Sequence, residues 1–289
     1  MVTLQSKLTN AVLWTCVILS ALVSAAPLLK TDLVRHILPF AFVTVLSIFT
    51  VVHGVRRYGW KSLLVLFCLT FVISWSYETC SILTGFPFGK YHYSENLGPK
   101  LWLVPLLIMP AYFSMGYIAW MIGHILLDRF DDRPPGVDVI LIPVFSSFAM
   151  VMWDLCMDPS NSTVLGSWVW HEGGAYFGVP FVNFLGWYLC VFTIYQAFAL
   201  YLQGSTQSAG ETSLGDRLSW AFPALMYGTV MLGRLIAPLT IDSKQVASLD
   251  KHFWWTGDIY ASLALVSLFT MLFVTLLALV RVWRSSLLR

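Results

Sequence analysis

Residues 153–187 read W-D-L-C-M-D-P-S-N-S-T-V-L-G-S-W-V-W-H-E-G-G-A-Y-F-G-V-P-F-V-N-F-L-G-W. Here an apolar segment ends in two acids, Asp154 and Asp158, and a loop rich in Trp and Gly leads to a second apolar segment that opens at Pro180. Because the two acids are four residues apart, they share one face of a helix. An acid at membrane depth is costly and marks a candidate functional site. We therefore expect the other apolar segments to surround this pair.

The composition is that of a protein with many membrane-spanning segments. Of the 289 residues, 58% are hydrophobic and only 11% are charged, and the mean hydropathy is +0.74. Ordinary globular chains are about 25% charged. The net charge of +2 and the lack of a basic run argue against a nucleic-acid-binding surface. We predict an all-α, polytopic transmembrane bundle, with one integral membrane domain over 1–289 and a motif-rich core at 71–187.

Eight segments are long enough to span a membrane as helices, which need about 20 apolar residues and satisfy their own backbone. They are 11–29, 38–55, 63–83, 101–127, 137–157, 180–202, 219–239 and 255–280. An even number of spans puts both termini on one side. That side carries Lys7, Arg56, Arg57, Lys61, Arg129, Arg133, Arg217, Arg281, Arg284 and Arg289. The other side carries fewer basic residues, so the positive-inside rule places both termini in the cytoplasm.

The alternation of these segments gathers the ionisable groups at membrane depth into the opposite half of the bilayer. Arg234 is the one basic residue well inside a predicted span. The acids predicted at this face are Glu78, Asp154, Asp158, Glu172, Asp242 and Asp258.

Glu78 lies in an apolar run, three residues after Trp75, and is followed by T-G-F-P-F-G-K-Y-H-Y at 84–93. Burial disfavours the charged form of a carboxyl group, so a neutral Glu78 can donate a proton. The alternative is a structural hydrogen bond to a neighbouring helix. The loop that follows either folds back over a cavity, since Gly allows tight turns, or forms an aromatic belt at the membrane interface.

Pro159 ends the helix that carries the two aspartates, because the residue before a proline disfavours the helical region. Asp158 then sits near a helix C-terminus, where negative charge is disfavoured. A second carboxyl one turn away makes it costly to ionise both, which suits general acid chemistry. The alternatives are a helix cap and a salt bridge to Arg234.

Aromatic residues dominate the loop and the segment after it. The faces of Trp168, Trp170 and Trp187 can each stabilise a cation by roughly 0.5–2 kcal/mol, and several around one cavity would hold a carbocation without bonding to it. Interfacial packing is the alternative for any one of them. No His box, P-loop or G-x-S-x-G motif is present in the sequence, so we expect neither a metal nor another cofactor.

Together these motifs resemble the integral membrane carotenoid biosynthesis proteins, a family that includes hydratases adding water to the terminal double bond of an acyclic end group. The resemblance covers about 71–187. It is carried by Glu78, the stretch 84–93, Trp153-Asp154, Asp158-Pro159, Trp168-Val169-Trp170, and Y-F-G-V-P-F-V-N-F-L-G-W at 176–187. It implies protonation of an isoprenoid alkene to a tertiary carbocation, in an apolar pocket open to the bilayer, without metal or nucleotide.

We therefore expect a membrane enzyme that hydrates a carotenoid-like end group taken from the bilayer. Asp154 or Glu78 is the expected proton donor, and Asp158 is expected to tune that donor or to activate the water. The predicted substrate site comprises Trp75, Tyr91, Trp153, Trp168, Trp170, Tyr176, Asn183 and Trp187, with Arg234 and Asp258 supporting the carboxyl groups.

Two other functions share these features. A proton-initiated terpenoid cyclase would use the same acid and aromatic wall, with water excluded and an internal alkene as the nucleophile. A proton-coupled transporter or lipid-binding protein would use the acids as a relay. Transporters commonly carry internal repeats and broken helices at the membrane midplane, and the sequence shows neither.

Overall fold

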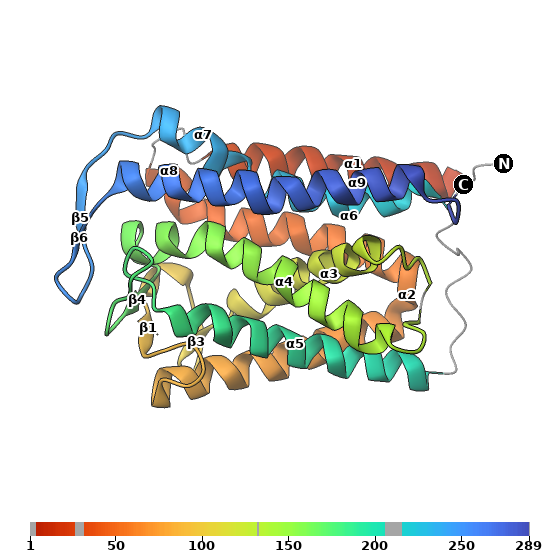
Figure 1. Cartoon of the computed structure of the whole chain (residues 1–289), viewed down its shortest axis with the longest axis horizontal. Coiled ribbons are helices and arrows are strands. Elements are labelled where there is room, and N and C mark those ends of the chain that lie inside the picture. The colour runs from red at the N-terminus through yellow and green to blue at the C-terminus, as the bar shows by residue number, and fades with distance from the viewer. Residues whose placement is uncertain (1–3, 27–31, 132, 206–215, 289) are drawn as a thin grey trace.

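The structure is a computed structural model that describes residues 4–26, 32–131, 133–205 and 216–288. It is a bundle of long helices that lie side by side, with short strands at one end (Figure 1). The all-α, polytopic class predicted from the sequence is confirmed. The last residues of the first predicted span, 27–29, and the terminal Arg289 lie outside the described residues.

The elements follow the chain in a simple order. The longer helices are α1 (Leu4–Ala25), α2 (Asp32–Thr84), α3 (Ile108–Leu126), α4 (Asp138–Pro159), α5 (Phe181–Gly204), α6 (Arg217–Thr229), α7 (Leu232–Thr240), α8 (Thr256–Ser267) and α9 (Phe273–Arg284). The short helical turns are η2 (Glu95–Leu97), η3 (Ser160–Val164) and η4 (Leu268–Leu272). The strands are β1 (Tyr91–Tyr93), β2 (Lys100–Leu101), β3 (Val104–Pro105), β4 (Trp168–Trp170), β5 (Gln245–Ala247) and β6 (Phe253–Trp255).

Six helices within the described part of the chain are long and apolar enough to cross a membrane. One of them, at Ile37–Thr84, has 48 residues and holds two of the predicted spans. It is interrupted at Gly59, whose φ of 73° and ψ of 167° lie outside the helical region. Glycine adopts such a positive φ without a steric penalty. The two halves of α2 consequently lie on different sides of the bundle (Figure 1).

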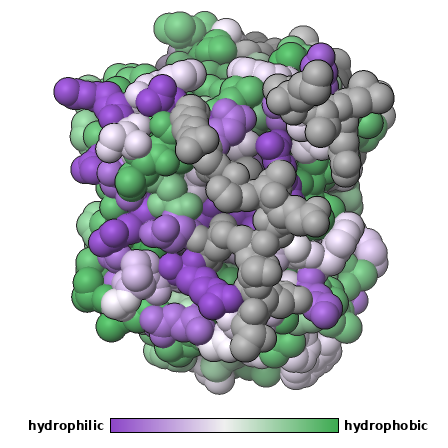
Figure 2. All heavy atoms as spheres, turned by 90° about the vertical axis from the view of Figure 1, so that its right-hand side faces the viewer, coloured by the Kyte–Doolittle hydropathy of each residue, from purple (hydrophilic) through white to green (hydrophobic). Residues whose placement is uncertain are grey.

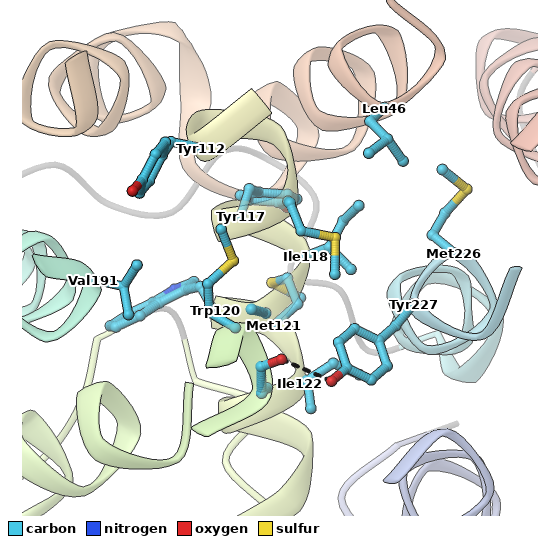
Figure 3. Packing of buried hydrophobic residues seen from close by; sticks show 14 of the residues in the cluster. Leu46, Tyr112, Tyr117, Ile118, Trp120, Met121, Ile122, Val191, Met226 and Tyr227 are labelled. Carbon is cyan, nitrogen blue, oxygen red and sulfur yellow. Dashed lines mark hydrogen bonds between the residues drawn. The ribbon is translucent and has the colours of Figure 1, made fainter. Parts of the chain in front are cut away.

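The predicted span at 101–127 corresponds to α3, which is not among those six helices but forms the centre of the bundle. Every residue from Tyr112 to Ile125 is buried, and α3 packs against α2, α4, α6 and α9. A helix that is apolar all round belongs in such a position. Figure 3 shows side chains of α3 meeting Leu46, Val191 and Met226 of its neighbours, while Tyr227 donates a hydrogen bond to the Ala149 carbonyl at 2.7 Å.

The outer helices expose large apolar side chains along their length. On α9 these include Phe273, Leu276, Val280 and Trp283, which recur at helical spacing. A surface of this kind is stable against lipid rather than water. Figure 2 looks at the end of the bundle that carries the termini, where hydrophilic residues, several of them at the left margin, lie among hydrophobic ones. The chain is an integral membrane protein.

The start of α1 and the end of α9 lie at the same end of the bundle (Figure 1). The cytoplasmic location of that end stays a prediction. At the opposite end, β1 pairs with β4 in antiparallel register, with Tyr91 opposite Trp170 and Tyr93 opposite Trp168. β5 pairs with β6 in a hairpin beyond the helices. The candidate site lies at this strand-bearing end.

Candidate active site

One cavity of about 660 Å³ opens among the helix ends and loops at the strand-bearing end of the bundle. This is within the usual range for small-molecule sites. Its walls come from α1, α2, α3, α4, α5, α7 and α8, together with β1, β4 and the loops beside them. Two acids far apart in the sequence, Glu78 of α2 and Asp158 of α4, both line it.

Glu78 is 3% exposed and is held by three phenol groups. Tyr112 donates to Oε1 at 2.7 Å, and Tyr93 donates to Oε2 at 2.9 Å. Tyr91 also donates to Oε2. All three hydroxyl groups point at the carboxyl group, which is the arrangement that fits an anion, since an ionised carboxylate only accepts hydrogen bonds.

Asp158 and Asp154 are joined through one amide. Asn183 Nδ2, on α5, donates to Asp158 Oδ2 at 2.8 Å and to Asp154 Oδ2 at 3.0 Å. Asp158 Oδ1 also accepts from the indole nitrogens of Trp168, at 2.9 Å, and Trp170, at 3.4 Å. Asp154 has no solvent exposure, and its Oδ1 has no hydrogen-bond partner within the described part of the chain. Asp158 thus faces the cavity, with Asp154 directly behind it.

Two residues from other parts of the chain donate hydrogen bonds to the last turn of α4, where Pro159 interrupts the backbone hydrogen bonding. Pro159 has no N–H, so the carbonyl of Leu155 one turn earlier loses its usual donor. The Tyr176 hydroxyl supplies that hydrogen bond at 3.1 Å. On the other side, Arg234 Nε donates to the carbonyl of Cys156 at 3.3 Å. Two residues distant in sequence therefore hold the helical turn that carries both aspartates.

The aromatic wall is centred on Trp187. Its ring stacks on Tyr112, with centroids 4.4 Å apart and planes 1° apart, and meets Trp153 edge-to-face at 6.0 Å. Phe88 lies 6.3 Å away, in a loop that crosses close over α5. This crossing requires Gly186, because a Cβ there would lie 2.7 Å from the Pro87 carbonyl oxygen. Tyr112 contacts both parts of the site, because its hydroxyl donates to Glu78 and its ring stacks on Trp187.

The structure brings together most, though not all, of the side chains predicted for the site. Those that line the cavity are Glu78, Tyr91, Trp153, Asp158, Trp168, Trp170, Asn183, Trp187 and Arg234. Trp75 lies outside it, donating to the Leu101 carbonyl at 3.2 Å. Asp258 is exposed in the first turn of α8. Asp154 and Tyr176 lie behind the cavity wall, where Asp154 accepts from Asn183 and Tyr176 donates to the Leu155 carbonyl of α4.

Three residues of the candidate site were not predicted from the sequence. They are Tyr93 and Tyr112, which donate to Glu78, and Phe88, which lines the cavity. Tyr93 and Phe88 lie in the motif at 84–93, so their place in that motif was a usable signal. Tyr112 lies in an apolar segment with nothing to distinguish it. Among the residues that the structure describes, no three His, Cys, Asp or Glu side chains meet in a way that could hold a metal ion.

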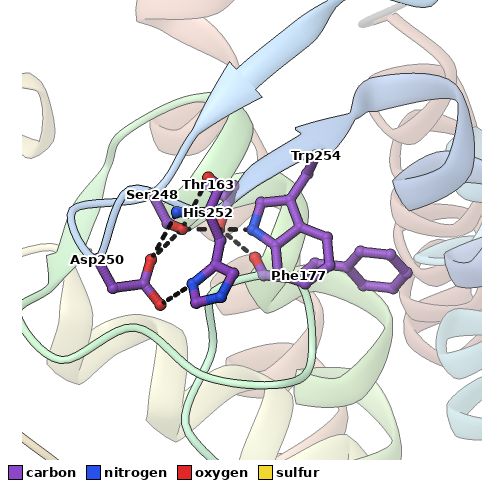
Figure 4. Close-up of polar contacts among 6 residues, drawn as sticks. All are labelled: Thr163, Phe177, Ser248, Asp250, His252 and Trp254. Atoms are coloured by element: carbon purple, nitrogen blue, oxygen red, sulfur yellow. Dashed lines mark hydrogen bonds and ion pairs between the residues drawn. The ribbon is translucent and has the colours of Figure 1, made fainter.

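The other end of the cavity has polar lining residues, among them Asp242 and Lys244, which precede the β5–β6 hairpin. Thr163 donates to the Phe177 carbonyl at 2.5 Å, and the Phe177 ring meets Trp254 of the hairpin at 5.4 Å. Within the hairpin, His252 Nδ1 lies 2.8 Å from Asp250 Oδ2 (Figure 4). These contacts bring the hairpin up against the loop that follows α4.

Residues 36–247, most of the chain, match the model of the family described as carotenoid biosynthesis protein. The chain belongs to the carotenoid biosynthesis protein family. This confirms the resemblance predicted from the sequence, and the matched range contains Glu78, Asp158 and the amide of Asn183 that joins the aspartates.

Among curated proteins, this member of the family is similar to the bisanhydrobacterioruberin hydratase of Haloarcula japonica. The two are 31% identical over 135 residues, which are 46% of this chain and 42% of that protein. The matched stretch therefore spans less than half of the relative's length. No solved structure matches the chain.

Proposed function

We propose that the protein is a hydratase that protonates the terminal double bond of an acyclic, carotenoid-like end group and adds water to the resulting tertiary carbocation. The observation that carries this proposal is the convergence of Glu78 and Asp158 on one aromatic-lined cavity. The end group enters from the bilayer, since it is apolar and the helices that form the walls lie in lipid.

Asp158 is the acid and then the base. Its proton passes to the less substituted alkene carbon, so that a C–H bond forms, the π bond breaks and Asp158 becomes a carboxylate. Water attacks the cation, forming a C–O bond, and its extra proton returns to Asp158. General acid–base groups contribute about 10²–10⁴-fold to such steps. Asp154 accepts from the same amide as Asp158, and two buried carboxyl groups so close are costly to ionise together, so one proton stays on the pair.

Glu78 stabilises the positive charge. Three phenol donors hold its carboxylate at the cavity wall, and a fixed anion there lowers the energy of a nearby cation. The rings of Trp153, Trp170 and Trp187 add cation–π attraction. Asp258 and Trp75 have no part in this proposal, because neither lines the cavity.

The relative named as a hydratase favours hydration over cyclisation and over transport. The same acid would start either a hydration or a cyclisation, so the fate of the cation separates these two functions. An apolar pocket without water would direct it to an internal alkene, whereas this cavity also has polar lining residues such as Asn161 and Lys244.

Heavy-oxygen water tests the proposed reaction. Membranes of a host that expresses the protein are incubated with bisanhydrobacterioruberin, the compound named for the relative, or with lycopene as a second acyclic carotenoid. A hydratase gives a product that carries one heavy oxygen per water added. A product of unchanged elemental composition would identify a cyclase, and no conversion of either compound would reject the proposal.

A further inference from the structure

The cavity has two chemically different ends. Near Glu78 its walls are aromatic and aliphatic, with Phe88, Tyr112 and Trp187 beside the acid. At the other end the lining is polar and comes from α7, α8 and the segment between them. The polar lining residues there are Arg234, Asp242, Lys244, Thr256 and Tyr260.

The polar end leads to the surface. Asp242 and Lys244 are exposed, Arg234 and Tyr260 are half-buried, and Asp158 beyond them is 1% exposed. Polar groups thus extend from the outside to the acid along one continuous cavity. A polar passage of this kind suits water, since a bound water needs two to four hydrogen-bond partners and an isoprenoid chain needs none.

Arg234 lines the polar end of the cavity and also contacts the helix that carries the acid. Its Nε is used on the Cys156 carbonyl, two residues before Asp158. The ion pairs among the described residues do not include Arg234. A guanidinium has five N–H donors and accepts nothing, so donors remain for an oxygen atom in the cavity that Arg234 lines. The helix that carries the acid and the donor that faces the cavity are therefore fixed to each other.

We propose that the polar end is the water entrance and that Arg234 is the positioning residue that holds the attacking water beside Asp158. This inference rests on the proposed hydratase function and adds the origin of the nucleophile. One N–H of Arg234 binds a lone pair of the water, one water hydrogen points to the Asp158 carboxylate, and the remaining lone pair faces the cation. Arg234 thereby determines whether the cation gains water or loses a proton.

In deuterium oxide, the two fates of the cation give products that differ in oxygen content, although both contain deuterium. The acid transfers a deuteron to the alkene carbon in both cases. Capture of water gives a hydrated product that contains deuterium. If water is missing, a carboxylate removes a proton from a neighbouring carbon, and the recovered alkene carries deuterium without oxygen. The ratio of hydrated product to deuterated alkene measures how well the water is held, independently of how much enzyme is folded.

The test compares Arg234→Met and Arg234→Lys with the unchanged protein, in membranes supplied with bisanhydrobacterioruberin or lycopene in deuterium oxide. Loss of a charged donor is expected to lower the ratio by about tenfold or more in Arg234→Met. Arg234→Lys keeps a charged donor and is expected to restore part of the ratio. Lys251→Met removes an exposed cation of the β5–β6 hairpin that does not line the cavity; it serves as the control and is expected to keep the original ratio.

Two outcomes contradict the inference. In the first, Arg234→Met retains the original ratio; if both products fall in equal proportion, the residue only supports α4. In the second, Arg234→Lys gives the same ratio as Arg234→Met. If the unchanged protein adds neither deuterium nor oxygen to either carotenoid, the proposed function itself fails and the inference fails with it.

Discussion

Asn183 Nδ2 lies 2.8 Å from Asp158 Oδ2 and donates a hydrogen bond to it. The same nitrogen reaches Asp154 at 3.0 Å, so one amide serves two buried carboxyl groups. An amide nitrogen has two hydrogens, and both are used here. The orientation of Asp158 toward the cavity therefore depends on a residue that belongs to a different helix.

Replacing that amide is expected to disable the acid. Asn183→Leu keeps the approximate size but removes both hydrogen bonds, which leaves two carboxyl groups without a shared donor. We expect hydration to fall by at least about 100-fold, as for loss of an acid–base group. Product formation per folded protein is the measurement. Gln196→Met, on the same helix, removes an amide that donates to the Val139 carbonyl, and retained activity is expected there.

The phenol groups around Glu78 give a second prediction. Tyr112→Phe removes one donor to the carboxylate, and a hydrogen bond to a charged group contributes about 1.5–3 kcal/mol. We expect turnover to fall by roughly tenfold or more. Tyr227→Phe also removes a buried hydroxyl, but one bonded to the Ala149 carbonyl away from the cavity. It is expected to lower thermal stability and leave turnover unchanged, so equal turnover losses in both variants would contradict the role of Glu78.

The crossing of the Phe88 loop over α5 gives a third prediction. In Gly186→Ala the new methyl would meet Pro87 backbone atoms 2.7–2.8 Å away, so the loop must move. Such overpacking costs about 1–3 kcal/mol, and we expect a lower melting temperature together with lost hydration. Gly204→Ala, near the end of the same helix, meets nothing within 4 Å. If Gly186→Ala behaved like Gly204→Ala, the close crossing would be wrong.

The strand pair that carries the tyrosines and tryptophans is expected to weaken in acid. On its outer side, His92 Nδ1 lies 2.8 Å from His171 Nε2, a contact that needs at least one neutral ring. Partial burial, and then the charges of His171 and Lys100, lower the pKa of His92 below its usual value near 6.5. The unfolded chain therefore binds more protons, and the stability that this contact provides is lost as the pH falls below about 6.5.

Melting temperatures in detergent at pH 7.5 and pH 5.5 measure this effect. The unchanged protein is expected to lose about 1–2 °C more across that interval than His92→Gln does, because the glutamine does not titrate. Identical pH dependence in the two proteins would show that the histidine contact does not contribute.

The sequence correctly predicted the end of the bundle at which the acids lie. The spacing of Asp154 and Asp158 placed both on one helix face, and alternation of the apolar segments placed Glu78 at the same end of the bundle. Both inferences need only the rise of a helix and the length of a span. In the structure these acids do lie at one end, the end that carries the paired strands (Figure 1).

The sequence did not predict how each helix is rotated about its own axis, and therefore which of its side chains face the cavity. Asp258 has the depth of the site but is exposed on α8, and Asp154 lies behind Asp158 although both share a face. Apolar residues surround both positions, so hydropathy does not distinguish the side that faces the cavity. Tyr112 illustrates the same limit, because only the tertiary arrangement of the helices directs its hydroxyl at Glu78 and its ring at Trp187.

The central claim is that a carboxyl group of this cavity protonates an isoprenoid double bond. Its most direct test is the rate at which solvent deuterium enters a carotenoid end group, compared between the unchanged protein and Asp158→Asn in the same membranes. We predict deuterium at the carbon next to the new C–O bond with the unchanged protein, and a rate at least about 100-fold lower with Asp158→Asn. Deuterium entry at the original rate in Asp158→Asn would contradict the account.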